Sequence, residues 1–115
     1  MSNIQQITII VDANGIGSID REIVRVTNTD TLLQFNLVAI GYAFPAANAV
    51  IVADPDAPFY GSWTTSPYEA ALVDRRTPPY GVYYYGVNVL NTITNETRPL
   101  QFGSGVQPRI NNNNE

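Results

Sequence analysis

Short apolar runs with a two-residue period, separated by turn residues, dominate this sequence of 115 residues. Residues 7–11 and 23–27 are rich in β-branched side chains, and Leu33, Phe35 and Leu37 alternate with polar residues. Such alternation predicts strands with one buried face, and no segment keeps a helical period. Because the runs follow one another at intervals of about 8–12 residues, the sequence predicts a sandwich or barrel rather than alternating strands and helices.

The remaining strands are less uniform. The apolar run at 49–53 is continuous and predicts a strand covered on both faces. Residues 54–67 are rich in proline and aromatic residues and predict a loop, with a short strand near Trp63. Residues 68–73 fit either a strand, which we favour, or a single helical turn. Residues 82–90 predict the longest strand and 97–102 a return strand, whereas 16–20 predict a short edge and 106–110 a short extended piece.

These elements lead to one fold class and one domain. We expect an all-β domain, an antiparallel sandwich of two sheets with about seven or eight strands. Residues 1–110 would form the domain, because a chain of this length has room for one core. Residues 111–115 are polar and are expected to form a flexible tail.

Missing residue types exclude most catalytic chemistry. The sequence has no cysteine and no histidine, and its six basic residues are all arginines. Thiolate nucleophiles, imidazole bases, the usual copper and zinc sites and lysine Schiff bases are therefore absent, and we expect no cofactor. The catalytic option that remains is a pair of carboxylates drawn from Asp54, Asp56, Glu69 and Asp74, and we expect the protein not to be an enzyme.

Charge and hydropathy bear on partners and location. The net charge is −4 and the arginines are scattered, so we expect no binding to nucleic acid. No apolar stretch is long enough to span a membrane, and the first residues lack the pattern of a signal peptide. We therefore expect a soluble protein that is cytoplasmic or exported without a leader.

Aromatic and basic side chains gather in the least regular region and are the candidate binding residues. Aromatic rings can stack on sugars or anchor a protein partner, and neighbouring arginines can grip an anionic group. The alternative is structural: Trp63 and Phe59 would close one end of the core, and the arginines would form a solvated loop or a surface ion pair. The candidates are Phe59, Tyr60, Trp63, Tyr68, Arg75, Arg76 and Tyr80.

Asp54 and Asp56 are the candidates for a metal site. Their carboxylates could hold Ca²⁺ together with Asp30 or Asp74 from other loops. The favoured alternative is that each aspartate caps a turn before a proline.

A resemblance adds to the fold prediction. Leu72, Asp74 and Gly81, followed by the alternating Tyr83, Tyr85, Val87 and Val89, resemble the entry into the F strand of immunoglobulin-like domains. The segment Tyr42-Ala43-Phe44-Pro45 before an apolar strand is similar to one in small bacterial sandwich proteins of immunoglobulin-like or cupredoxin-like type. The resemblance implies an immunoglobulin-like fold with Tyr83 as a structural tyrosine corner, and it implies no activity.

These observations lead to two hypotheses for the function. The first is a non-catalytic structural or protein-interaction module that acts through an exposed sheet edge or the aromatic loop, on a protein partner or a second copy. The alternative is a carbohydrate-binding module that uses Tyr60, Trp63 and Tyr80, with or without a Ca²⁺ ion nearby.

Overall fold

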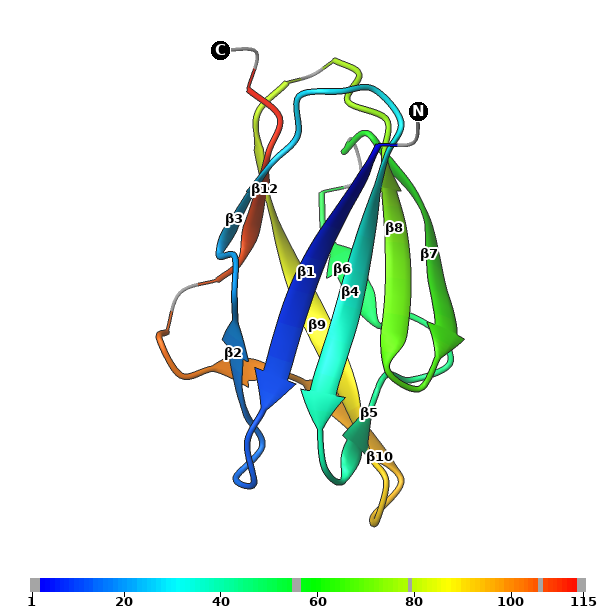
Figure 1. The fold of residues 1–115 in the computed structure, drawn as a ribbon, viewed down its shortest axis with the longest axis vertical. Helices are drawn as coiled ribbons and strands as arrows, with labels where there is room; N and C mark the ends of the chain where they lie inside the picture. The colour runs from blue at the N-terminus through cyan, green and yellow to red at the C-terminus, as the bar shows by residue number, and fades with distance from the viewer. Residues whose placement is uncertain (1–2, 55–56, 79, 106, 114–115) are drawn as a thin grey trace.

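The structure is a computed structural model that describes residues 3–54, 57–78, 80–105 and 107–113. The described residues form strands and turns, which confirms the all-β prediction (Figure 1). No helix able to span a membrane is present in this described part of the chain.

The strands form two sheets, each built around one long central strand or pair. The first sheet has the order β11-β2-β1-β4-β8-β7. Its strands are β1 (Ile4–Val11), β2 (Ile16–Ile19), β4 (Thr31–Ala39), β7 (Phe59–Ser66), β8 (Glu69–Asp74) and β11 (Gln101–Phe102).

The second sheet is arranged around β9 (Val82–Asn91), the longest strand. One edge of β9 pairs with β12 and then β10, and its other edge pairs with β6 and β5. The shorter strands are β3 (Ile23–Arg25), β5 (Tyr42–Ala43), β6 (Val50–Val52), β10 (Glu96–Pro99) and β12 (Arg109–Asn111).

The sheets are mixed, and the prediction of a purely antiparallel sandwich is wrong. Three pairs are parallel: β1 with β4, β3 with β12, and β2 with β11. Alternation in a sequence shows which face of a strand is buried, but it carries no information on the direction of the neighbouring strand. The pairing direction follows from how the chain crosses between the sheets.

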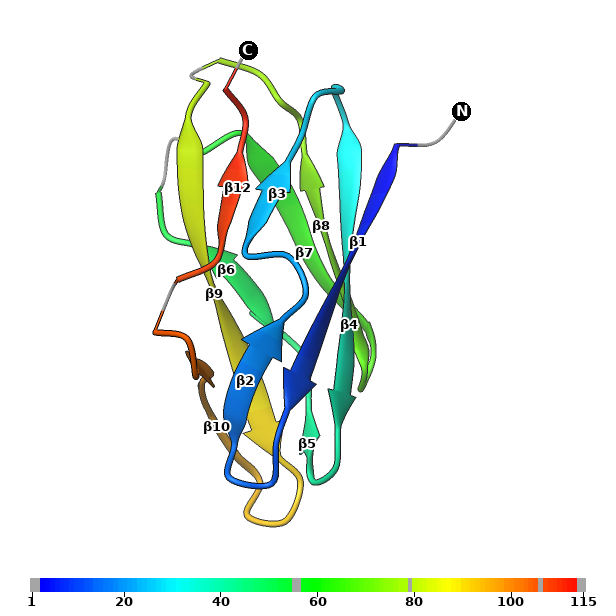
Figure 2. The same ribbon diagram turned by 60° about the vertical axis from the view of Figure 1, so that its left-hand side comes forward.

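Two segments make this crossing. After β2 the chain passes through Asp20 and enters β3 in the second sheet, so that β2 lies beside β1 while β3 lies beside β12 (Figure 2). The second crossing runs from β10 to the first sheet, where Gln101 pairs with Ile16, and then back to β12. The described residues contain twelve strand segments rather than seven or eight. The second crossing accounts for one of the extra segments, because it divides the strand predicted at 97–102 into β10 and β11.

The core lies between the sheets and confirms the predicted alternation. Leu33, Phe35 and Leu37 of β4 are buried, and they face the buried Tyr85 and Val87 of β9. The rings of Phe35 and Tyr85 meet edge to face, with centroids 5.4 Å apart. Tyr83 is also buried, but its role as a tyrosine corner stays a prediction.

Three local predictions need correction or completion. Residues 59–66 form the eight-residue strand β7, rather than a loop with a short strand near Trp63. The strand favoured at 68–73 is confirmed as β8, Glu69–Asp74. The run at 49–53 is not covered on both faces, because Ile51 of β6 is 41% exposed. This outward face opens onto a pocket described below.

The start of the predicted tail is part of the packed domain. Asn111 ends β12, and the side chain of Asn112 is fully buried. The Asn112 amide nitrogen donates to Asp74 Oδ1 over 2.9 Å, and its backbone N–H donates to the carbonyl of Gly81. Residues 111–113 are thus held against the end of the sandwich.

Candidate functional site

The bulged strand β7 brings Tyr60 and Trp63 to the same face of the first sheet. The register of β7 against β8 shifts between Tyr60 and Ser62, at Gly61, whose φ is +65°. Residues 60 and 63 would point to opposite faces of a regular strand, and the extra residue of the bulge restores a common face. A Cβ atom at position 61 would overlap the Trp63 ring, so glycine is required there.

Arg75 completes a cluster with these two aromatic residues. The Tyr60 and Trp63 rings are edge to face at 6.4 Å, and the Arg75 guanidinium carbon lies 4.1 Å from the centre of the Tyr60 ring. Tyr60 is 40% exposed and Trp63 is 46% exposed. We call Tyr60, Trp63 and Arg75 the aromatic edge, because β7 is the last strand of the first sheet in the described pairing.

The aromatic edge continues into a row of side chains across the outer face of the same sheet. Trp63 pairs with Ala71, Ala71 with Gln34, and Gln34 with Gln6. Directly paired residues share a face and lie about 5 Å apart, so a small side chain and two amides follow the indole ring across the sheet. This outer row carries no charged side chain.

The other predicted binding residues lie elsewhere. Phe59 points to the inner face and packs edge-on against Tyr83, with centroids 5.5 Å apart. Tyr68 is exposed, but it lies in the turn between β7 and β8, at the opposite end of β7 from Tyr60. Tyr80 packs against Arg76, whose guanidinium carbon is 5.3 Å from its ring centre.

Arg75 and Arg76 do not form one anion-binding pair, because they point in different directions. Arg75 covers Tyr60, whereas Arg76 Nε donates to the carbonyl of Val26 over 2.9 Å. Arg76 has a positive φ of 50°, and its backbone N–H donates to Asp74 Oδ1. Arg76 therefore ties β3, β8 and the C-terminal segment together.

Of the four candidate carboxylates, Glu69 and Asp74 lie too far apart to act as a catalytic pair. Glu69 and Asp74 stand at opposite ends of β8 and on opposite faces, about 16 Å apart along the strand. Asp74 is fully buried, and burial raises its pKa above the ordinary value of 3.8. Asp54 is exposed, and Asp56 lies outside the described residues. Within residues 3–54, 57–78, 80–105 and 107–113, no three acidic, histidine or cysteine side chains are grouped to hold a metal ion.

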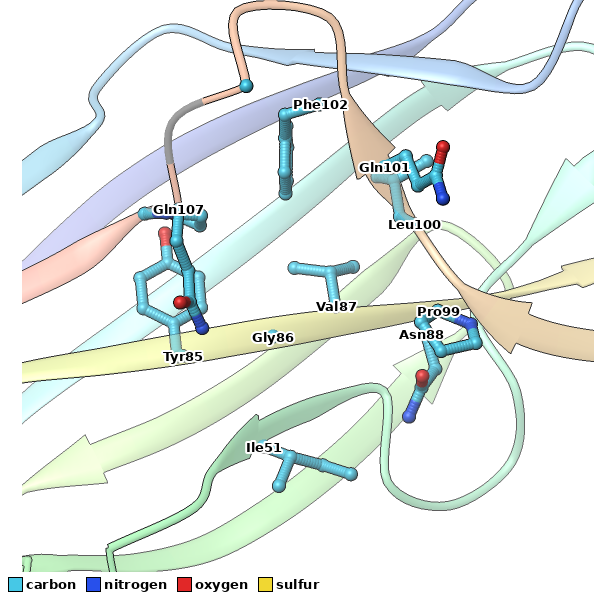
Figure 3. Close-up of a pocket in the computed structure, with 12 residues that line it drawn as sticks. Ile51, Tyr85, Gly86, Val87, Asn88, Pro99, Leu100, Gln101, Phe102 and Gln107 are labelled. Atoms are coloured by element: carbon cyan, nitrogen blue, oxygen red, sulfur yellow. The ribbon is translucent and has the colours of Figure 1, made fainter.

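A pocket of about 490 Å³ opens on the second sheet. Gly86 and Val87 of β9 line its middle, Leu100 lies to one side, and Phe102 and Ile51 stand on opposite sides (Figure 3). This pocket was not predicted from the sequence. The signals that could have indicated it are Gly86 within the longest strand, and Pro108, which has no N–H to donate to a neighbouring strand.

Neither protein-family models nor curated proteins give a match to this chain. We therefore infer the function from the geometry of these two sites.

Proposed function

We propose that this domain is a non-catalytic recognition module that binds a protein partner through the aromatic edge, and that the partner is a second copy of this chain. The proposal depends mainly on one observation: an eight-residue strand at the end of a sheet has no charged side chain and exposes a tyrosine and a tryptophan. Natural edge strands usually carry charges that prevent association. Tryptophan, tyrosine and arginine are also the residues most enriched where binding energy concentrates in interfaces.

The bulges of β7 favour recognition by side chains over strand addition. Register shifts at Gly61 and between Thr64 and Ser66 interrupt the regular row of main-chain groups that an added strand would need. Trp63 and Tyr60 lie on the sheet face beside this edge, where a partner surface can cover both rings.

Charge complementarity supports a second copy as the partner. Arg75 lies next to Tyr60, and Glu69 pairs with Ser66 at the opposite end of β7. In a two-fold arrangement of antiparallel edges, Arg75 of one copy would face Glu69 of the other. Both ends of the interface would gain an ion pair, which fixes the register.

We further propose that the sandwich is of the immunoglobulin-like or cupredoxin-like type. Support comes from its two packed sheets and from the chain crossing between them after β2. This proposal assigns a class of fold and no activity.

The chain carries its own probe for association, because Trp63 is its single tryptophan. Sedimentation velocity across a dilution series should show a concentration-dependent dimer, with a blue shift of Trp63 emission as the dimer forms. Trp63→Ala should weaken the dimer at least tenfold, whereas Ile93→Ala, at a residue 88% exposed in a turn, should leave it unchanged. A monomer at every concentration would overturn the proposal.

Charge reversal tests the two-fold arrangement. Glu69→Arg or Arg75→Glu alone should weaken the dimer, because each places like charges opposite one another. The double variant carries both reversals in every copy and should recover most of the affinity. If the losses of dimer affinity in the two single variants simply added in the double variant, the predicted register would be contradicted.

Carbohydrate binding is the second candidate, and the outer row favours it. An exposed indole followed by Ala71, Gln34 and Gln6 offers a stacking surface beside amide hydrogen-bonding groups. Titration with cellohexaose should then change Trp63 emission in a monomer, and Gln34→Ala should weaken binding at least tenfold. Tyr80 lies outside this row, so Tyr80→Phe is the matched control.

A further inference from the structure

The second sheet is interrupted beside the middle of β9, between β10 and β12. The last pair on one side is Pro99 with Asn88, and Asn88 donates its N–H to Ala49 on the opposite edge of β9. On the other side the backbone N–H of Tyr85 donates to the carbonyl of Pro108, and proline has no N–H with which to donate back to Tyr85. Hydrogen bonding to this edge of β9 therefore reaches Leu100 on one side and Pro108 on the other, and the chain between them leaves the sheet.

The first part of the departing segment, from Leu100 to Gly103, is held by two backbone hydrogen bonds. The backbone N–H of Leu100 donates to Val87 over 2.7 Å, and that of Gly103 donates to Gly17 over 2.9 Å. A Cβ atom at Gly17 would lie 2.7 Å from Leu100 Cδ2, so Gly17 leaves the space that the leucine fills. Leu100 is buried as a result and forms a firm wall of the pocket.

The chemistry of the lining defines the ligand class. Aliphatic and aromatic surfaces form the interior, and the amides of Asn88, Gln101 and Gln107 stand around it (Figure 3). The described lining includes no ionisable side chain except the buried Tyr85, whose pKa is raised by burial and by the nearby Asp20. A charged ligand would lose hydration without gaining a partner charge, whereas amides can donate to and accept from a neutral ligand.

We propose that this pocket binds a small neutral organic molecule that contains a ring. The ligand would have one apolar face and hydroxyl or amide groups at its edge. Its volume of about 490 Å³ lies in the range typical of small-molecule sites. Gly86 has no atom within 4 Å of the position of a Cβ, so a flat ring can approach the β9 backbone there. The proposal is independent of the aromatic edge, because that cluster belongs to the first sheet.

The proposal can be tested with phenol, cyclohexanol and benzamide as neutral probes, and with benzoate and benzylamine as charged counterparts. Two-dimensional ¹H–¹⁵N NMR should show saturable shifts at Gly86 and at the side-chain amides of Asn88, Gln101 and Gln107. We expect at least one neutral probe to bind at least tenfold more tightly than either charged counterpart. Trp63 signals should stay unchanged.

Matched glycine variants separate the pocket from the fold. Gly86→Leu fills the opening and should weaken binding of the neutral probes at least tenfold. Gly81→Leu is the control, since a Cβ at Gly81 also meets no atom within 4 Å, and it should leave their affinity unchanged. The proposal is overturned if no neutral probe shifts the lining residues, or if Gly86→Leu binds as well as the parent. Because dimerisation is measured at Trp63, failure of this proposal is distinguishable from failure of the proposed function.

Discussion

The fully buried pair of Asp74 and Asn112 has more acceptor atoms than donors. Asp74 Oδ1 accepts from Asn112 and from the backbone of Arg76, while Asp74 Oδ2 and Asn112 Oδ1 have no hydrogen-bond partner among the described residues. Burial raises the pKa of Asp74, and this effect exceeds the opposing effects of the Arg76 backbone, Asn112 and the Arg76 charge. A proton on Asp74 Oδ2 would supply the donor that the amide oxygen of Asn112 lacks.

Asp74→Asn is expected to raise stability at pH 7 by about 1 kcal/mol, because an amide supplies this donor without a buried charge. The native state of the parent binds the proton more tightly than the unfolded state. The stabilisation from protonation is therefore fully present below pH 3.8 and is lost as the pH rises through the raised native pKa. Urea unfolding at pH 4 and pH 7 should show the advantage of the variant shrinking at the lower pH.

Asp74→Ala is the matched comparison. It removes the acceptor for both Asn112 and Arg76, so it should destabilise the protein by about 2 kcal/mol at either pH. A large loss in Asp74→Asn at pH 7, equal to that of Asp74→Ala, would show that the ionised carboxylate is required.

Tyr85 presents a second buried polar atom without a partner. Its hydroxyl has no hydrogen bond within the described residues, although the ring packs well against Phe35. Tyr85→Phe keeps this packing and removes the unpaired hydroxyl, so it should raise stability by about 1 kcal/mol in thermal or urea unfolding. Tyr84→Phe, at an exposed position on the same strand, should change stability by less than about 0.5 kcal/mol. A destabilised Tyr85→Phe would mean that the hydroxyl has a partner.

At the scale of elements, β7 depends on the conformation of Gly61. Gly61→Ala should destabilise the protein by about 2 kcal/mol, because the positive φ and the overlap with Trp63 add together. Trp63 emission should change as the ring is displaced, and the proposed dimer should weaken with it.

Gly41→Ala separates the two causes. Gly41 also has a positive φ, of 84°, but a Cβ there meets no atom within 4 Å. The Gly41→Ala variant should lose about 1 kcal/mol of stability, with no change in Trp63 emission. If Gly61→Ala lost only as much stability as Gly41→Ala and left the Trp63 emission unchanged, the Trp63 ring would not lie over Gly61.

At the scale of the whole molecule, the two sheets cannot separate without losing strand pairs, because two segments of the chain pair with both sheets. The β2–β3 segment belongs to both sheets, and the segment between β10 and β12 crosses and returns. We therefore expect a single cooperative unfolding transition, in which Trp63 emission and far-ultraviolet circular dichroism have the same midpoint.

Ile110→Ala tests this coupling from the opposite sheet. Ile110 lies fully buried in β12, so the substitution should destabilise the protein by about 2–5 kcal/mol. The Trp63 transition in the first sheet should move by the same amount. Ile40→Ala, at a residue 95% exposed, should move neither signal. Separate midpoints for the two signals would contradict a single cooperative unit.

The sequence by itself determined the fold class, the faces of the long strands and much of the available chemistry. Leu33, Phe35 and Leu37 are buried as their alternation predicts, because the period of a strand is a local property of the backbone. The absence of cysteine, histidine and lysine limits catalysis and metal binding whatever the fold.

Tertiary structure decided the rest, because it depends on contacts between segments distant in the chain. Strand direction in the mixed sheets follows from the two crossings, which no local pattern records. The sequence predicted Tyr60, Trp63 and Arg75 as candidate binding residues. Only the folded chain makes them one surface, through the bulge at Gly61 and the packing of Arg75 on Tyr60. Asn112 reads as part of a polar tail and is buried because β12 ends beside Asp74. The pocket exists because the chain leaves the edge of β9 after Leu100 and returns to it at Pro108, and only the folded chain brings these two points beside the same strand.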